Sequence, residues 1–243
     1  MPIRAVLWDV DDTLFDHTGA DTDALVALLA RSGPTAPRHG SPAAALAAWR
    51  AATARHWARF EAGELTFEDQ RLHRVREFLA APHLSDAEAG AWFAGHLERY
   101  EASWRLFPDT LPTLDALAAS HRHAILSNSV NPIQHRKLTA LGIRDRFELL
   151  LCSDDLGRAK PDPGAFHAAC AALGLPPAEV LYVGDQPETD ARAAHAAGLA
   201  AVWIDRTGSD APVPEGAHRI RGLSELAEAS GIDTRFGARS GIR

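Results

Sequence analysis

Residues 5–14 read AVLWDVDDTL, a short apolar run that passes directly into a cluster of three aspartates. Such a run is typical of a buried strand in a parallel sheet. Asp9 and Asp11 lie two residues apart, so an extended backbone points both side chains to the same side. In open parallel sheets, ligands bind at the end of the strands where these acids lie. The stretch therefore predicts an α/β fold with a site after its first strand.

Two carboxyl groups this close repel each other as anions unless a cation lies between them or one of them holds a proton. Both arrangements are useful in catalysis, because one acid can be a metal-bound nucleophile while the other moves protons. The structural alternative is a turn followed by a helix cap. The rest of the chain favours the functional interpretation.

Composition limits the class of protein. The 243 residues fit one domain with an insertion, or two small domains, and 46% hydrophobic residues can form a packed core. The net charge of -7 argues against binding to nucleic acid polymers or anionic membranes. Cys152 and Cys170, the only cysteines, are expected to be small buried side chains rather than disulfide or metal ligands. Without a signal-peptide pattern or a membrane-spanning stretch, a cytoplasmic location is expected.

Strand and helix patterns alternate in the first strand and in everything after about residue 106. This alternation predicts a Rossmann-like parallel sheet covered by helices on both faces. One helix is expected to begin after Asp162, an N-cap followed by a proline, and to end at Gly174. Two more are expected over 111–119 and 190–198. The expected strands are 5–8, 123–126, 149–152, 180–183 and 200–204, with a short sixth near 218–220.

Residues 16–103 differ, because they carry amphipathic helix patterns and no strand pattern. Helix starts are expected at Ser41, where a proline follows, and at capping boxes that begin at Thr66 and Ser85. We therefore predict a helical cap domain over 16–103, inserted into a core made of 1–15 and 104–230. Residues 231–243 are expected to form a mobile tail.

Three further polar sites follow predicted strands. Ser127 and Asn128 follow the second strand, where a hydroxyl and backbone N–H groups can hold an anionic oxygen, or simply form a turn. Lys160 stands before a proline and a helix start, and could neutralise a phosphoryl group or be a surface lysine. Asp185 follows the fourth strand and suits a hard cation. Asp190 could cap the next helix, but we prefer a supporting role at the metal.

Taken in order, these four motifs resemble those of the haloacid dehalogenase superfamily of aspartate-nucleophile hydrolases. The acid pair is DVDDTL at 9–14, the hydroxyl motif is SN at 127–128, the lysine motif is KPD at 160–162, and the acidic motif is GDQPETD at 184–190. The resemblance covers nearly the whole chain. The helical insertion after the first motif matches the subfamily with an α-helical cap of the C1 type.

The resemblance implies catalytic and metal-binding roles. Asp9 would attack phosphorus and form an aspartyl-phosphate, while Asp11 would protonate the leaving alcohol and later activate water. Asp11 must then carry a proton part of the time, which neighbouring negative charge would favour. Mg²⁺ would be held by Asp9, the backbone carbonyl of Asp11 and Asp185, with Asp190 in support.

The resemblance also implies a set of phosphate-binding residues, aided by backbone N–H groups near Asp11 and Asn128. The helical cap would close over the site and exclude water. The expected phosphate-binding residues are Thr13, Ser127, Asn128 and Lys160.

The second acid separates the reactions that this scaffold supports. The dehalogenases of the family attack carbon, release a halide that needs no proton, and typically lack an acid at the position of Asp11. A phosphate monoester releases an alkoxide that needs a proton. We therefore expect a Mg²⁺-dependent phosphomonoesterase that acts on a small phosphorylated metabolite. A phosphomutase shares all these groups and is the nearest alternative, followed by a 2-haloacid dehalogenase and by a non-catalytic binding protein.

Overall fold

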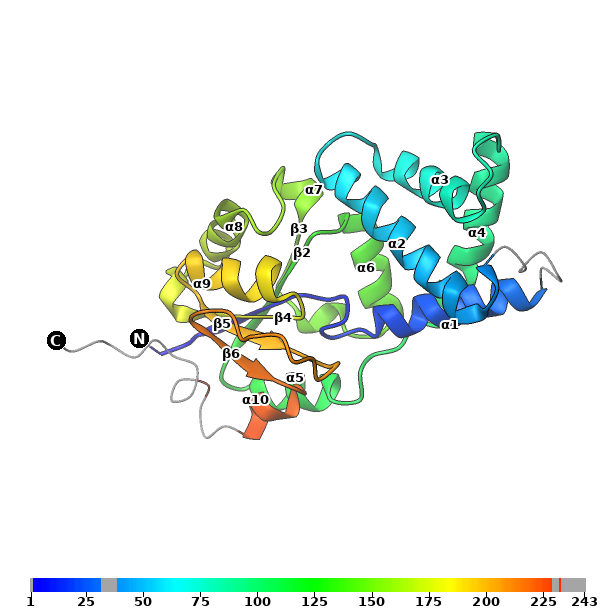
Figure 1. Ribbon diagram of the computed structural model, residues 1–243. Coiled ribbons are helices and arrows are strands. Elements are labelled where there is room, and N and C mark those ends of the chain that lie inside the picture. Colours follow the sequence, from blue (N-terminus) through cyan, green and yellow to red (C-terminus); the bar gives the residue numbers. More distant parts are fainter. Residues whose placement is uncertain (1, 32–38, 229–231, 233–243) are drawn as a thin grey trace. The chain divides into compact units, whose positions relative to one another are not determined.

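The computed structural model describes residues 2–31, 39–228 and 232 (Figure 1). The chain divides into two compact units. The sheet unit consists of Met1–His17 and Arg105–Arg243, and the helical unit consists of Thr18–Trp104. Apart from Ile232, the tail expected over 231–243 lies outside the described residues.

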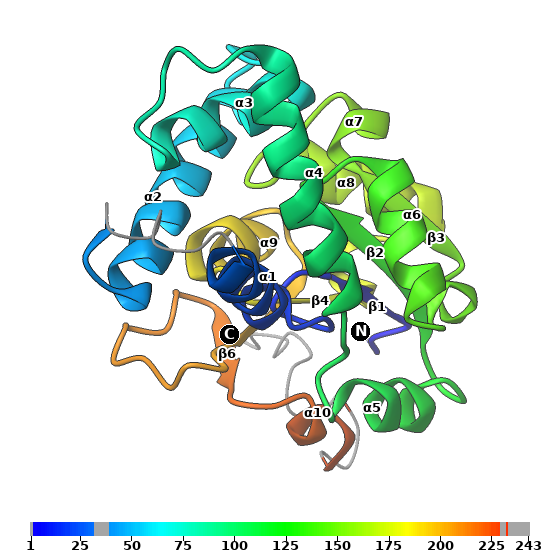
Figure 2. The ribbon, with the colours of Figure 1, turned by 90° about the vertical axis from the view of Figure 1, so that its right-hand side faces the viewer.

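Six parallel strands form the sheet, in the order β3-β2-β1-β4-β5-β6 (Figures 1 and 2). They are β1 (Ala5–Trp8), β2 (Arg122–Ser127), β3 (Leu149–Cys152), β4 (Val180–Gly184), β5 (Ala200–Ile204) and β6 (Ala217–Ile220). β1 lies between β2 and β4, and Trp8 is level with Ile125 on one side and Val183 on the other. The α/β prediction is confirmed, and all six strands lie within one residue of their predicted bounds. The strand order reverses beside β1, where open parallel sheets bind ligands.

Helices cover both faces of the sheet. On one face, α8 (Pro163–Leu173) and α9 (Ala193–Ala196) join a buried cluster that includes Leu7 of β1. On the other side lie α5 (Thr110–Leu117) and α10 (Ser224–Glu228) (Figure 1). The sheet unit also contains α6 (Asn131–Ala140), α7 (Ser153–Leu156), the π-helix η4 (Pro187–Arg192) and the 3₁₀ helices η2 (Arg144–Arg146) and η3 (Pro177–Glu179).

Helix α8 begins and ends where the sequence predicts. Asp162 Oδ1 accepts the N–H of Gly164 at 2.7 Å, and Pro163 occupies the first turn, where it costs no hydrogen bond. Gly174 ends the helix with a φ of 66°, a conformation that favours glycine. The helix expected over 190–198 starts earlier than predicted, because η4 precedes α9 without a break.

The described residues of the helical unit form four helices and no strand. The helices are α1 (His17–Arg31), which starts at the unit boundary, α2 (Pro42–Glu61), α3 (Phe67–Phe78) and α4 (Asp86–Ala102). Ser41 caps α2, and capping boxes at Thr66 and Ser85 start α3 and α4, as predicted. No helix of the described residues is long and apolar enough to cross a bilayer. Whether this unit is a cap of the C1 type stays a prediction.

The helical unit has its own hydrophobic core. Leu25, Trp49 and Phe78 are almost fully buried together, and Trp92 packs against them. The indole Nε1 of Trp49 donates to the Asp21 carboxylate at 3.0 Å, which satisfies the one polar group that this ring buries.

A buried polar pair joins β1 to β2. The indole Nε1 of Trp8 donates to Nδ1 of His123 at 3.0 Å, so that nitrogen accepts and carries no proton. His123 is only 7% exposed. Burial is the main cause that lowers the pKa of His123 from 6.5 to about 4, and the positive charges of His121 and Arg146 add to this shift. The imidazole is therefore neutral in the folded protein.

Acid should destabilise the protein through His123. Between pH 6.5 and about 4 the unfolded chain binds a proton that the folded imidazole does not. The free energy of unfolding therefore falls as the pH falls, by at most about 1.4 kcal/mol per pH unit for one such group. Urea unfolding at several pH values should show a flatter slope for His123→Asn, whereas His135→Asn, at an exposed position of α6, should keep the slope of the wild type. An unchanged slope in His123→Asn would contradict this assignment.

Candidate active site

The carboxyl ends of β1, β2 and β4 bring the predicted motif residues together. Asp9 follows β1, and its N–H donates to the carbonyl of Val183 at 2.9 Å, so the pairing with β4 continues past Trp8. Ser127 is the last residue of β2, and Asp185 follows β4 directly. Neighbouring parallel strands thus deliver side chains from distant parts of the sequence to one edge.

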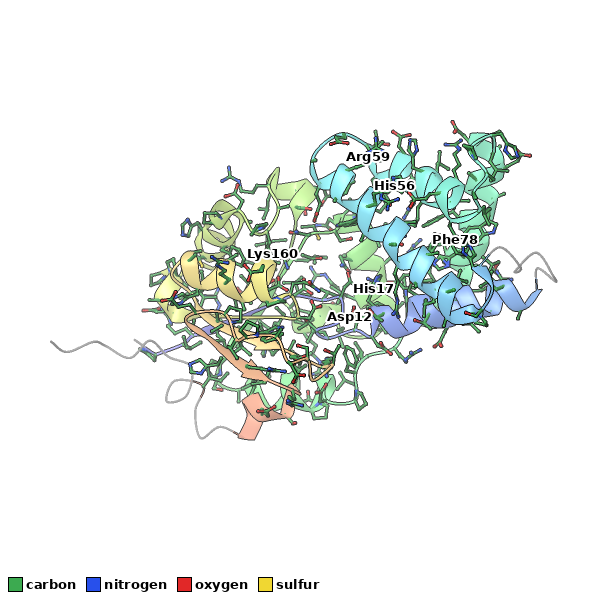
Figure 3. The ribbon with its side chains drawn as sticks, viewed as in Figure 1. Asp12, His17, His56, Arg59, Phe78 and Lys160 are labelled. Atoms are coloured by element: carbon green, nitrogen blue, oxygen red, sulfur yellow. The ribbon has the colours of Figure 1, made fainter. Side chains whose placement is uncertain are left out.

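Lys160, whose position in the sheet unit is labelled in Figure 3, is the centre of a buried charge cluster. Its side chain is 3% exposed, and its Nζ donates to Asp9 Oδ1 at 2.8 Å, to Asp190 Oδ1 at 2.7 Å and to Tyr182 Oη at 2.7 Å. An ammonium group has three N–H donors, so all of them are used. Asn128 fixes the backbone of Lys160 from both sides, since its Nδ2 donates to the carbonyl and its Oδ1 accepts the N–H, each at 2.7 Å.

The cluster contains more acid than base. Burial alone would lower the pKa of Lys160, but the carboxylates of Asp190 and Asp9 raise it well above its ordinary value. Burial raises the pKa of Asp9 to about 7, although Lys160 pulls it down. Burial, with Asp9 and Asp190 close by, also raises the pKa of Asp185 well above its usual range. One ammonium therefore does not balance these acids, and a further positive charge would stabilise their ionised forms.

The donor set fits a hard divalent cation. Asp9, Asp185 and Asp190 each offer a carboxylate oxygen, and these atoms lie within 4.8 Å of one another. The oxygens of Asp190 already have partners, since Oδ1 accepts from Lys160 and Tyr182 and Oδ2 accepts the N–H of Gln186 at 2.9 Å. Asp9 and Asp185 are therefore better suited to contact an ion directly. Oxygen ligands with excess negative charge are what Mg²⁺ prefers.

Gly184 leaves room for this arrangement. A Cβ atom built at Gly184 would overlap the carboxylate of Asp190. Asp190 reaches back over the end of β4 to the N–H of Gln186 instead of capping the helix that follows it. A glycine is therefore needed at position 184 for a steric reason, because the carboxylate of Asp190, which binds Lys160, lies too close for a side chain.

Asp11 lies outside this cluster and has its own cation. Lys137 Nζ lies 2.5 Å from its Oδ1, and Gln134 Nε2 donates to its Oδ2 at 2.9 Å. Burial would raise the pKa of Asp11, but Lys137, and to a lesser extent His17, lower it to about 2. We expected neighbouring negative charge to favour a proton on Asp11, but the positive charge of Lys137 outweighs that effect.

The loop that carries the two acids is held by its own backbone. The carbonyl of Val10 accepts the N–H groups of Leu14 and Phe15, both at 3.0 Å. Asp12 has a φ of 58°, a left-handed conformation that aspartate tolerates better than most residues. Thr13 is fully buried, and its hydroxyl donates to Asp9 Oδ2 at 3.4 Å. The structure thus places Thr13 behind the nucleophile candidate, where it can orient that carboxylate.

Sequence reasoning missed three residues of the site: Gln134, Lys137 and Tyr182. Lys137 had a detectable signal, because the chain contains only two lysines. Each of the two lysines pairs with one of the two acids of the first motif, Lys160 with Asp9 and Lys137 with Asp11. Tyr182 gave no signal, because an aromatic residue in an apolar strand is ordinary core.

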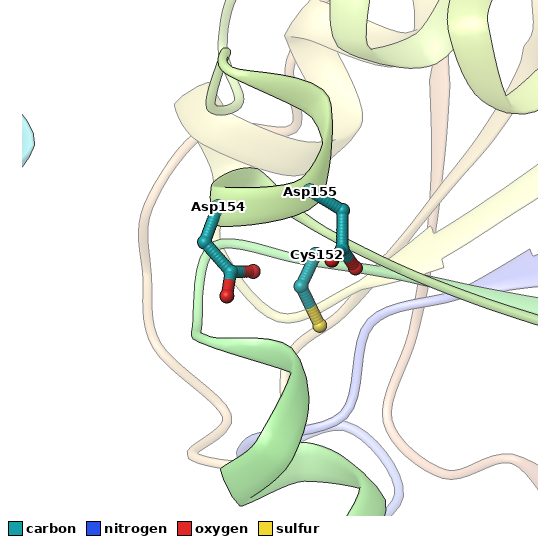
Figure 4. A group of neighbouring side chains, drawn as sticks. All are labelled: Cys152, Asp154 and Asp155. Carbon is teal, nitrogen blue, oxygen red and sulfur yellow. The ribbon is translucent and has the colours of Figure 1, made fainter.

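A second group of candidate metal ligands, Cys152, Asp154 and Asp155, lies at the end of β3 (Figure 4). Its acids hold the start of α6, since the carboxylate of Asp154 accepts the N–H of Asn131 at 3.1 Å and Asp155 accepts its Nδ2 at 2.6 Å. Burial raises the pKa of Cys152 to about 12, so the thiol stays protonated. Cys152 and Cys170 are both free and buried, as predicted.

Residues 3–198 match the family model of the haloacid dehalogenase-like hydrolases. The chain belongs to this family. The resemblance carried by the four motifs is therefore confirmed for the family as a whole.

Relatives within the family include phosphatases and dehalogenases. The chain is 32% identical to a phosphoglycolate phosphatase of Photorhabdus laumondii over 215 residues, which cover 83% of this chain and 80% of that protein. It is 41% identical to a phosphoserine phosphatase of Thermus thermophilus over 100 residues, only 39% of this chain and 40% of that protein. A solved 2-haloacid dehalogenase from Pseudomonas syringae pv. Tomato is 27% identical with a TM-score of 0.64, covering 93% of this chain and 97% of that one.

Removing Lys160 should destabilise the fold. Lys160→Met would leave Asp9 and Asp190 buried without their cation. Breaking a buried ion pair from one side typically costs about 3–5 kcal/mol. Urea unfolding in the presence of a chelator should measure a loss of this size. Arg158→Met, which removes an exposed cation from the same loop, should cost less than about 0.5 kcal/mol. Similar losses in both variants would contradict the central role of Lys160.

Proposed function

We propose that the protein is a Mg²⁺-dependent phosphomonoesterase that hydrolyses a small phosphorylated metabolite through an aspartyl-phosphate at Asp9. The observation that carries this proposal is the position of Asp9, buried at a strand end beside Lys160, in an acid cluster whose charge one ammonium does not balance. The phosphoglycolate phosphatase relative, aligned over most of the chain, supports the same reaction class.

Asp9 is arranged to attack with a single oxygen. Its Oδ1 is fixed by Lys160 at 2.8 Å, whereas its Oδ2 has only the long 3.4 Å contact with Thr13 among the described residues. Lys160 therefore orients the carboxylate and leaves Oδ2 the more weakly engaged atom. A fixed carboxylate next to a bound phosphoryl group loses little entropy on the way to the transition state.

The metal would correct the charge imbalance. Asp9, Asp185 and the backbone carbonyl of Asp11 would hold Mg²⁺, with Asp190 in support. When bound, the ion supplies positive charge that keeps the carboxylates ionised and neutralises phosphoryl oxygens. Ser127, Lys160 and backbone N–H groups near Asp11 and Asn128 would hold the other phosphoryl oxygens.

Asp11 would serve as acid and then as base. In the absence of substrate it is a carboxylate, because its pKa is about 2. A bound phosphate brings negative charge close to it and so favours proton uptake. The carboxyl group then gives this proton to the leaving oxygen of the substrate. The carboxylate that results takes a proton from the water that hydrolyses the aspartyl-phosphate.

A dehalogenase is the alternative with a specific observation in its favour, the similarity to the Pseudomonas syringae enzyme along most of the chain. Asp11 favours the phosphatase, because a halide leaves without a proton. A phosphomutase uses the same groups and differs in the fate of the phosphoryl group. Assays for free phosphate, free halide and isomerised sugar phosphates distinguish the three reactions.

Asp9→Asn should abolish phosphate release. The amide is a poor nucleophile, so the rate with 4-nitrophenyl phosphate should fall by about 10³-fold or more. The matched control is Asp115→Asn, an exposed acid of the sheet unit with a side chain 61% exposed, and it should keep full activity. Halide release from a 2-haloacid without phosphate release from any ester would overturn the proposal.

Chelation should abolish activity, and added Mg²⁺ should restore it. Because the metal would bind only the folded protein, Mg²⁺ should also raise the melting temperature of the wild type. Asp185→Asn removes one proposed ligand and should weaken Mg²⁺ binding measured by calorimetry. Asp154→Asn, at the second acidic group, should bind Mg²⁺ as the wild type does. Equal binding by Asp185→Asn and the wild type would contradict the proposed ligand set.

A further inference from the structure

Helix α6 holds Asp11 by both carboxylate oxygens. Lys137 Nζ contacts Oδ1 at 2.5 Å and Gln134 Nε2 contacts Oδ2 at 2.9 Å. Gln134 and Lys137 are three residues apart and so lie on the same face of the helix. Both are buried, with exposed fractions of 0% and 3%. A charged lysine at this degree of burial is a fixed partner of Asp11 rather than a solvated surface cation.

Gln134 joins Asp11 to the hydroxyl motif. Its Nε2 donates to Ser127 Oγ at 3.0 Å as well as to Asp11, so both N–H bonds of the amide are used. The orientation of this amide is fixed, because the opposite orientation would turn its oxygen toward the Asp11 carboxylate. One buried side chain therefore sets the distance between the acid–base candidate and a phosphate-binding candidate.

The oxygen of the same amide indicates that this contact is functional. Gln134 Oε1 is buried and has no hydrogen-bond partner in the described part of the chain. A buried, unpartnered acceptor destabilises a fold, and an apolar side chain of similar size would avoid that loss. The contact of Nε2 with Asp11 and Ser127 gives a reason for a glutamine at this position.

Lys137 is held from a second direction. The ring of Phe15 lies 4.5 Å from its Nζ, in the range of a cation–π contact. Phe15 belongs to the same loop as Asp11, and its own N–H is bound to the carbonyl of Val10. Loop and helix therefore fix the ammonium group together, and the ammonium group fixes Asp11.

We infer that Lys137 and Gln134 are positioning residues that keep the carboxyl group of Asp11 within reach of the leaving-group oxygen. The inference rests on the proposed function, in which Asp11 moves the proton. Without these contacts the carboxyl group can rotate about its two side-chain bonds. Proton transfer requires hydrogen-bond distance, so rotation lowers the fraction of enzyme that is ready to react.

Two substrates of similar shape test this role. Phenol is a weaker acid than 4-nitrophenol, so phenyl phosphate depends more on proton transfer to its leaving group. Lys137→Met and Gln134→Leu should each lower kcat for phenyl phosphate by about 10- to 100-fold and kcat for 4-nitrophenyl phosphate by less than about 3-fold. KM should stay nearly unchanged, and Lys137→Arg should recover part of the loss. Arg136→Met, an exposed position of the same helix, is the control and should behave as the wild type.

A second measurement does not depend on activity. Urea midpoints of Asp11→Asn, Lys137→Met and the double variant form a cycle. If the two groups hold each other, the midpoint shift of the double variant will be clearly smaller than the sum of the single shifts. Additive shifts would overturn the inference even if the enzyme is active.

The two tests separate failure of the inference from failure of the proposed function. A non-additive cycle with equal loss on both esters, or faster turnover in Lys137→Met, would show that the contact is not there to position Asp11. A wild type that releases no phosphate from any ester would instead refute the proposed function, and with it the catalytic purpose of the contact.

Discussion

Lys160 places an ammonium group among Asp9, Asp190 and Tyr182, where almost no water reaches. Removing such an ion from water costs several kcal/mol, and three charge-assisted or hydroxyl hydrogen bonds must offset that loss. The contacts around Lys160 follow from this need. Asn128 ties its backbone to the end of β2, and Gly184 leaves the space in which Asp190 reaches it. The strand ends are therefore locked together by one charge.

Asp9 and Asp11 of the first motif lie two residues apart but experience opposite environments. Burial raises the pKa of Asp9 to about 7, whereas Lys137 holds the pKa of Asp11 at about 2. Separated pKa values of this kind let neighbouring carboxyl groups take different roles. Each acid pairs with its own lysine, Asp9 with Lys160 and Asp11 with Lys137. The protein contains no other lysine.

A site with too little positive charge is unfavourable for the fold and useful for binding. The acids around Asp9 and Asp185 lower stability as long as nothing neutralises them. A divalent cation would relieve that repulsion. The free energy that the repulsion costs the folded protein would then contribute to the binding of the metal. Gln134 shows the same exchange of stability for function beside Asp11, because its buried oxygen lacks a partner in the described part of the chain while its Nε2 holds the acid.

The sequence by itself determined the parallel sheet, the positions of its six strands and the all-helical character of the unit between the first two strands. It also indicated the four motifs that meet at the strand ends, because apolar runs, caps and acid clusters are local signals. It did not reveal Lys137, Gln134 or Tyr182, which reach the site from a helix face and a core strand. Only the tertiary structure decided which lysine neutralises which acid. The electrostatic environment of a side chain depends on its distance from other charges and on its burial. The spacing of residues along the chain determines neither of these.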